Sequence, residues 1–174
     1  MKKTEGSRSR AFILNDYKRI VENKNNQNEY SVGLVNDDIY VWEVILFGPK
    51  DTAFENGIFR AEMIFPINYP EAPPTFRFAT KMWHPNIDKE GNVCISILHK
   101  PGDDMYGYED LNERWLPVRT PESVILSVLS LLSMPNCESP ANLEAAQNFR
   151  ENPEEYNNKV KKLVEQSLEE GFLE

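Results

Sequence analysis

Apolar residues recur at helical spacing near the start of the chain. Ile13, Tyr17 and Ile20 lie three or four positions apart, and the pattern stops at the Asn-rich residues 23–28. This spacing predicts an amphipathic helix that ends before the Asn-rich stretch. The polar residues 1–7 lack the pattern, and we expect them to form a flexible tail.

Three β-rich runs follow at residues 30–35, 39–47 and 57–65, and turn-forming residues separate them. In the third run, apolar residues occupy the odd-numbered positions 59–65 and alternate with a more polar set, so one face packs inward. The proline-rich start of residues 69–78 leads into a fourth run. Together these runs predict a four-stranded antiparallel sheet.

Helical signals resume after a long irregular stretch at residues 69–115. In a compact domain, a stretch of that length indicates a functional segment. Thr120 is a helix-capping residue directly before Pro121, and Asn142 and Asn152 precede two further helical patterns. The order of helix, sheet, long loop and helices predicts an α+β fold.

The chain shows no repeat and no linker, so we expect a single domain at residues 8–170 with a C-terminal tail at 171–174. A chain of 174 residues with 40% hydrophobic content can bury a core. The 19 basic and 28 acidic residues give a net charge of −9, which repels nucleic acids and anionic lipids. No apolar run reaches the roughly 18 to 20 residues of a membrane span, and the N-terminus does not resemble a signal peptide. We therefore expect a soluble intracellular protein with no nucleic-acid partner.

The two cysteines, Cys94 and Cys137, do not form a CxxC motif. Two separate thiols without a secretion signal favour a reducing compartment and no zinc site. Cys94 follows the polar turn at residues 88–92 within the irregular stretch, so it is a candidate nucleophile. A buried structural thiol is the alternative, because free cysteines are often buried. We interpret Cys137 as a packed or half-exposed thiol.

A cysteine hydrolase would need a histidine base, and the chain offers His84 and His99. Pro85 restricts His84 to extended backbone, so we expect its ring to hydrogen-bond nearby backbone rather than act as a base. Asn86 is the better candidate for direct chemistry, because its amide can donate to a developing oxyanion. The alternative is an Asn that satisfies its own loop, and the two roles are compatible.

Several motifs together resemble those of a known family. The segments "YPEAPP", "HPNIDKEGNVCISIL", "RWLP" and "SVILSVLSLLSMPNCESPAN" closely resemble, in order and spacing, the ubiquitin-conjugating enzymes. The resemblance covers residues 8–170 and implies that family's fold, with an N-terminal helix, four strands, a long active-site loop and C-terminal helices. The segment "LHKPGDDMYGYEDLNERW" further resembles the insertion that follows the active-site cysteine in the subgroup that builds polyubiquitin chains. Within that subgroup the chain resembles the G-type enzymes.

The resemblance implies roles for the His-Pro-Asn segment and for the cysteine after it. In the family this cysteine, here Cys94, accepts the C-terminal carboxyl of ubiquitin as a thioester and passes it to a lysine amine. Asn86 takes the position that stabilises the oxyanion or supports the active-site loop, and His84 and Pro85 take positions that shape this loop. No metal or organic cofactor is implied, because the activating enzyme consumes the ATP.

Two positions near the cysteine depart from the family pattern. Many members carry Asp where this chain has Ser96 and Ser139. The insertion, residues 99–113, offers carboxylates that can hold the ammonium of the acceptor lysine, and a merely solvated acidic loop is the alternative. These carboxylates are Asp103, Asp104, Glu109, Asp110 and Glu113.

The resemblance also implies surfaces that bind other proteins. One face of the helix that begins at Pro121 receives the thioester-linked ubiquitin, and a solvated face is the alternative. The residues of this face are Ser123, Leu126, Ser127 and Ser130. Ligases bind the first helix and two loops, which here contain Glu71, Trp115 and Pro117. Ser31 corresponds to a noncovalent ubiquitin contact on the opposite face of the sheet in some members.

The resemblance therefore implies an acyltransferase that uses a cysteine thioester. Its expected partners are ubiquitin, the ubiquitin-activating enzyme, ubiquitin ligases and protein substrates. Polyubiquitin chains for protein degradation are the expected product, in the cytoplasm, with the nucleus or recruitment to the endoplasmic reticulum by a partner as alternatives. Two other functions stay open, conjugation of a different ubiquitin-like modifier and noncatalytic ubiquitin binding. Cys94 and Asn86 speak against the noncatalytic alternative.

Overall fold

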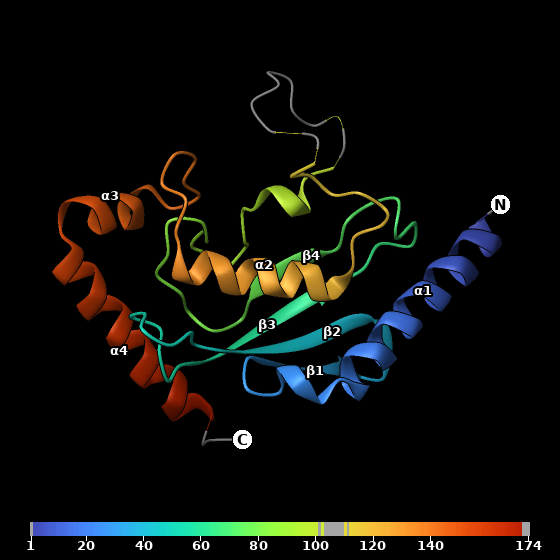
Figure 1. Ribbon diagram of the computed structural model, residues 1–174, viewed down its shortest axis with the longest axis horizontal. Coiled ribbons are helices and arrows are strands. Elements are labelled where there is room, and N and C mark those ends of the chain that lie inside the picture. Colours follow the sequence, from blue (N-terminus) through green and yellow to red (C-terminus); the bar gives the residue numbers. More distant parts are fainter. Residues whose placement is uncertain (1, 101, 103–109, 111, 172–174) are drawn as a thin grey trace.

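The structure confirms the predicted α+β class. The computed structural model describes residues 2–100, 102, 110 and 112–171 (Figure 1). Over these residues the helices are α1 (Lys2–Glu22), α2 (Pro121–Ser133), α3 (Leu143–Glu151) and α4 (Pro153–Gly171). The strands are β1 (Tyr30–Val35), β2 (Asp38–Phe47), β3 (Ile58–Ile64) and β4 (Thr75–Phe78). Short 3-10 helices are η1 (Lys24–Asn26) and η2 (Ser96–Leu98).

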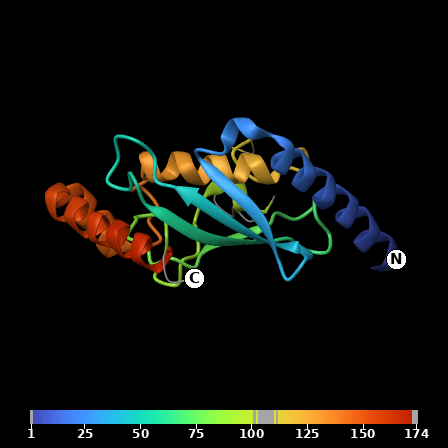
Figure 2. The same cartoon turned by 90° about the horizontal axis from the view of Figure 1, so that it is seen from below.

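The strands form one antiparallel sheet in the order β1-β2-β3-β4, as the sequence predicted. From Trp42 to Leu46 and throughout β3, every second residue is buried. The buried face belongs to the same core cluster as Val124 and Val128 of α2. Helix α2 lies along this face, and α1 and α4 lie at opposite ends of the sheet (Figure 1, Figure 2).

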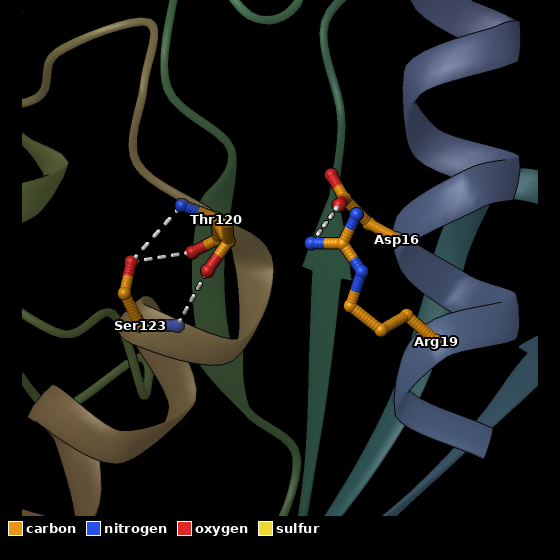
Figure 3. Close-up of polar contacts among 4 residues, drawn as sticks. All are labelled: Asp16, Arg19, Thr120 and Ser123. Carbon is orange, nitrogen blue, oxygen red and sulfur yellow. Dashed lines mark hydrogen bonds and ion pairs between the residues drawn. The ribbon is translucent and has the colours of Figure 1, made fainter. Parts of the chain in front are cut away.

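The predicted starts of the later helices are confirmed. Thr120 caps α2, because its side-chain oxygen accepts a hydrogen bond from the Ser123 N–H at 3.2 Å. Ser123 Oγ in turn accepts a hydrogen bond from the Thr120 N–H at 3.1 Å (Figure 3). Asn142 caps α3 through the Ala145 N–H at 3.0 Å, and α4 begins directly after Asn152. Such caps satisfy N–H groups that the first turn of a helix leaves unbonded.

Helix α1 begins earlier than the sequence predicted. It includes residues 2–7, for which the sequence predicts a flexible tail. The carbonyl oxygen of Gly6 accepts hydrogen bonds from the Tyr40 hydroxyl at 2.9 Å and from Ser9 Oγ at 3.2 Å. The bond from Tyr40 joins the start of the helix to β2, and no pattern within residues 1–7 indicates it.

Helix α4 extends to Gly171, which we had placed in a C-terminal tail. Residues 172–174 of that expected tail lie outside the described residues. In the part of the chain that the structure describes, no helix combines the length and the apolar character needed to cross a membrane.

A row of aromatic side chains connects α1, the sheet and the loop before β4. The ring centroid of Trp42 lies 5.4 Å from that of Tyr17 in α1 and 4.7 Å from that of Phe65. The row continues from Phe65 to Tyr69 at 5.0 Å, and from Tyr69 to Trp115 at 5.7 Å. Buried aromatic rings contribute strongly to a core. This row therefore fixes the loops at Tyr69 and Trp115 relative to α1.

The alternation in β3 predicts different effects for two adjacent residues. Met63→Ala should lower the free energy of unfolding by about 2 to 5 kcal/mol, because the Met63 side chain is fully buried. Ile64→Ala is the matched control on the other face, where Ile64 is 46% exposed, and should cost less than about 1 kcal/mol. Urea unfolding of both variants measures these losses. Equal losses would contradict the assignment of the two faces.

Candidate active site

Cys94 lies on the surface, two residues before the start of η2. Its thiol is exposed, and neither Cys94 nor the half-buried Cys137 forms a disulfide. The backbone N–H of Cys94 donates a hydrogen bond to the carbonyl oxygen of Asn86 at 2.8 Å. The alternative of a buried structural thiol is therefore wrong for Cys94, which is an exposed residue on a backbone held by Asn86.

The turn before Cys94 is organised by the side chain of Asp88. Asp88 Oδ1 accepts hydrogen bonds from the N–H groups of Asn92 at 2.8 Å and Glu90 at 3.0 Å, and Asp88 Oδ2 accepts one from Asn92 Nδ2 at 3.0 Å. Partial burial raises the pKa of Asp88, but the hydrogen bonds from Asn92, Glu90 and Gly91 outweigh it and leave this pKa below its usual value. The ionised Asp88 carboxylate thus stabilises the turn through these hydrogen bonds.

Gly91 fixes this turn against β4. Its φ is 94°, and a Cβ built on it would lie 2.2 Å from the carbonyl oxygen of Phe78. The Phe78 N–H donates a hydrogen bond to the Gly91 carbonyl at 2.8 Å, and the Val93 N–H donates one to the Phe76 carbonyl at 3.2 Å. Only glycine combines this backbone conformation with so close an approach. The hydrogen bonds of Gly91 and Val93 to β4 therefore fix the backbone directly before Cys94.

His84 is buried and uses both ring nitrogens for backbone hydrogen bonds. Nδ1 accepts a hydrogen bond from the Asn86 N–H at 2.9 Å, so Nε2 carries the proton and donates to the Leu131 carbonyl at 2.8 Å. Burial lowers the pKa of His84 to about 4, although the hydrogen bond to Leu131 acts in the opposite direction. The predicted backbone role is confirmed, and a neutral ring with both nitrogens engaged is not a base for Cys94.

Asn86 is 2% exposed and joins two loops. Its side-chain Nδ2 donates a hydrogen bond to the Asn136 carbonyl at 2.6 Å, and its Oδ1 accepts one from the Asn136 N–H at 2.8 Å. Next to it, the Pro85 carbonyl accepts hydrogen bonds from the N–H groups of Ala141 at 2.8 Å and Asn142 at 3.0 Å. These bonds hold the His-Pro-Asn segment against residues 134–142, which we call the 134–142 loop.

The two serines at the expected acidic positions occupy different settings. Ser96 is half-buried at the start of η2, and its carbonyl accepts a hydrogen bond from the His99 N–H at 2.9 Å. Ser139 is exposed in the 134–142 loop, two residues before Ala141. That loop is therefore the element that brings Ser139 towards Pro85.

Part of the acidic insertion is described. Asp110 and Glu113 are exposed, the Asp110 side chain accepts a hydrogen bond from the Asn112 N–H at 3.0 Å, and the Asp110 carbonyl accepts one from the Glu113 N–H at 2.9 Å. The predicted carboxylates Asp103, Asp104 and Glu109 lie outside the described residues. Across the described part of the chain, no three His, Cys, Asp or Glu side chains gather as metal ligands would.

The face of α2 predicted to bind ubiquitin is exposed at only some of its residues. Leu126 is 41% exposed and Ser130 is exposed. Ser123 and Ser127 are half-buried, and their hydroxyls donate hydrogen bonds to the carbonyls of Thr120 at 2.6 Å and Ser123 at 2.7 Å. A groove of about 520 Å³ runs beside Leu126 and Ser130. Accessible contacts on this face therefore come from Leu126 and Ser130.

The predicted ligase contacts also divide by exposure. Glu71 and Pro117 are exposed, and Glu71 lies 3.9 Å from the guanidinium of Arg8 on α1. Trp115 is 0% exposed, and its indole N–H donates a hydrogen bond to the Pro70 carbonyl at 2.7 Å. Direct contact between Trp115 and a ligase is therefore ruled out in this conformation, because the side chain joins the two loops from inside.

Sequence reasoning missed two exposed apolar residues beside these contacts. Val118 is 84% exposed next to Pro117, and Ile67 is 58% exposed before the "YPEAPP" segment. An apolar residue directly beside a loop proline was the signal that could have identified them. Ser31, the predicted backside contact, is exposed in β1.

Comparisons with known proteins give a consistent result. The family model described as "Ubiquitin-conjugating enzyme" matches residues 12–164. The chain is 56% identical over 147 residues to "Ubiquitin-conjugating enzyme E2 15" of Schizosaccharomyces pombe, which covers 84% of this chain and 88% of that protein. It is 58% identical over 142 residues to "Probable ubiquitin-conjugating enzyme E2 7" of Caenorhabditis elegans, and the match covers 81% of this chain and 87% of that protein. It is 48% identical over 132 residues to "Ubiquitin-conjugating enzyme E2 G2" of Homo sapiens, and the match covers 76% of this chain and 80% of that protein.

The buried His84 predicts a loss of stability in acid. Its pKa is about 4 in the folded protein, against about 6.5 for an unperturbed histidine. The unfolded chain then binds the proton more readily between these values, so stability should fall by roughly 3 kcal/mol as the pH is lowered from about 6.5 to about 4. NMR titration of the ring nitrogens should show a neutral His84 with its proton on Nε2 down to about pH 5.

His99→Gln makes this signal unambiguous, because His84 is then the only histidine in the chain. A His84 ring that titrates near its ordinary value, or that carries its proton on Nδ1, would contradict the assignment.

Proposed function

The chain belongs to the ubiquitin-conjugating enzyme family and to its G-type subgroup, and from this premise we propose that it carries ubiquitin as a thioester on Cys94. The exposed Cys94 thiol, on a backbone held by Asn86 and by the turn at residues 88–92, is the observation that supports the proposal. The Cys94 thiolate attacks the ubiquitin carbonyl held on the activating enzyme, and the thiol of that enzyme leaves. A neutral lysine amine then attacks the new thioester, an amide forms, and the Cys94 thiolate is released.

Asn86 is assigned first to support of the active-site loop. Both ends of its side-chain amide are bonded to the backbone of Asn136, so the resting contacts of Asn86 are loop contacts. The amide nitrogen has a second N–H that can donate to a developing oxyanion. The two family roles are therefore compatible, and loop support is the one that the contacts of the resting enzyme favour.

The acceptor lysine needs nearby negative charge. A free lysine has a pKa near 10.4, so only about one amine in 2,500 is neutral at pH 7. Serines stand at positions 96 and 139, where many relatives carry Asp, and we assign the missing charge to the acidic insertion. Asp103 and Asp104 are the principal candidates, and Glu109 and the exposed Asp110 follow them in the sequence. These carboxylates attract the incoming ammonium, and its proton then passes to solvent during attack.

Two surfaces are assigned to protein partners. Leu126 and Ser130 on α2 receive the thioester-linked ubiquitin, with Ser123 and Ser127 shaping the helix beneath. The exposed Glu71 and Pro117 contact the ligase, and the remaining predicted residue, Trp115, holds their loops together.

The products and the cellular setting follow from the subgroup. Polyubiquitin chains for protein degradation are the proposed product, made in the cytoplasm, with recruitment to the endoplasmic reticulum through a partner. Conjugation of a different ubiquitin-like modifier is the alternative activity. The exposed thiol of Cys94 argues against a noncatalytic role.

Thioester formation tests the proposal directly. With activating enzyme, ATP and ubiquitin, Cys94→Ser should replace a reductant-labile adduct with a more stable oxygen ester. Cys137→Ser is the matched control and should keep the labile adduct. Gels run with and without reductant give the readout, and another modifier in place of ubiquitin tests the alternative activity. A folded Cys137→Ser protein that cannot be charged would reject Cys94 as the only acceptor.

The role of Asn86 is tested after charging. Asn86→Ala should still accept ubiquitin but discharge it to free lysine about 10²- to 10³-fold more slowly, the range typical of lost oxyanion donors. Asn136→Ala is the matched comparison and should discharge much faster than Asn86→Ala, because it keeps the backbone groups that pair with Asn86 and loses only the side-chain bond to the Glu138 N–H. Single-turnover discharge measures both rates. If Asn86→Ala discharges as fast as the parent, Asn86 neither supports the active-site loop nor stabilises the oxyanion.

A further inference from the structure

Trp83 connects the last two helices to the residues that hold Cys94. Its indole Nε1 donates a hydrogen bond to Asn148 Oδ1 of α3 at 3.1 Å. The ammonium nitrogen of Lys159 in α4 lies over the same ring, 3.9 Å from its centroid. Trp83 is half-buried, so one helix holds its N–H and the next helix covers its ring.

The two helices that contact Trp83 are themselves joined. The rings of Phe149 in α3 and Tyr156 in α4 meet edge to face, with centroids 5.0 Å apart. Asn148 and Lys159 therefore act on Trp83 from a packed pair of helices rather than from two independent elements.

Trp83 directly precedes the segment whose hydrogen bonds lead to Cys94. His84 follows directly, and its ring accepts the Asn86 N–H at 2.9 Å. The Asn86 carbonyl in turn accepts the N–H of Cys94 at 2.8 Å. The position of the Trp83 indole can thus affect the position of the backbone that holds Cys94.

We propose that Lys159 is a positioning residue for ubiquitin transfer, acting through Trp83 on the His84–Asn86 segment. The proposal rests on the function proposed above. An ammonium over the face of a Trp ring is attracted by the electron density of that face. Lys159 is exposed, whereas the burial of α4 comes from residues such as Tyr156 and Val160. Removing its charge therefore leaves the buried face of α4 unchanged.

The test compares two reactions of the full chain. Lys159→Met removes the charge but keeps a long side chain, and should slow single-turnover discharge to free lysine about three- to tenfold, within the range of cation–π contacts. Charging of Cys94 should stay within about twofold of the parent, and the thermal midpoint should shift by no more than about 2 °C, because Lys159 is a surface residue.

Two further variants separate charge from packing. Lys159→Arg should restore discharge, because a guanidinium also stacks on an aromatic face. Lys162→Met, which removes an exposed lysine elsewhere on α4, is the matched control and should discharge at the parental rate. Equal slowing in Lys159→Met and Lys159→Arg would show that packing rather than charge matters, and would overturn the proposal. Parental discharge in Lys159→Met would overturn it as well.

Tryptophan emission supplies a readout that a general structural role would not move. Trp42 and Trp115 are fully buried, so a change in emission from Lys159→Met that disappears in the Trp83→Phe background reports Trp83. No change in either background would overturn the proposal. Charging of the parental protein is measured in the same series. If the parental protein is not charged with ubiquitin, the proposed function is rejected. If it is charged and Lys159→Met discharges at the parental rate, only the role of Lys159 is rejected.

Discussion

Burial of His84 and Asn86 requires that their polar groups find partners, and the arrangement around Cys94 depends on this constraint. An unpaired polar group inside a protein costs about 1 to 3 kcal/mol. The partners are the Leu131 carbonyl at the end of α2, the backbone of Asn136 and the N–H of Cys94. One set of hydrogen bonds therefore locates a helix end, a loop and Cys94 together. An irregular segment gains fixed geometry in this way without belonging to a helix or a strand.

Much of the fold could be predicted because its signals are local. The caps at Thr120 and Asn142 bond to groups three residues away, and the alternation in β3 is visible within seven residues. The pair formed by Asn86 and Asn136 spans 50 positions. No pattern near Asn136 indicates that bond. The helical start of α1 was missed for the same reason, since its contacts to Tyr40 cross more than 30 positions.

The sequence predicted which residues belong to the candidate site better than it predicted which of their side chains are exposed. The motif around Cys94 predicted a candidate nucleophile, but sequence left open whether its thiol is buried. Trp115 stands in a loop motif that implies a surface contact, yet its ring lies wholly inside the fold. The hydroxyl of Ser123 lies on a predicted binding face, but it is already used in the cap of α2. Spacing assigns a residue to a face, and only tertiary contacts decide whether its polar group is available.

The hydrogen bond from Trp115 to the Pro70 carbonyl has a consequence for association. Loops that become ordered when two proteins meet lose conformational entropy, and that loss weakens affinity. Here the loops of Glu71 and Pro117 are tied to each other within the folded chain, so most of that entropy is lost during folding instead. A protein that docks across both loops meets a preorganised surface. Selectivity between such proteins then depends on the side chains at the rim of that surface, because its underlying shape is the same for all of them.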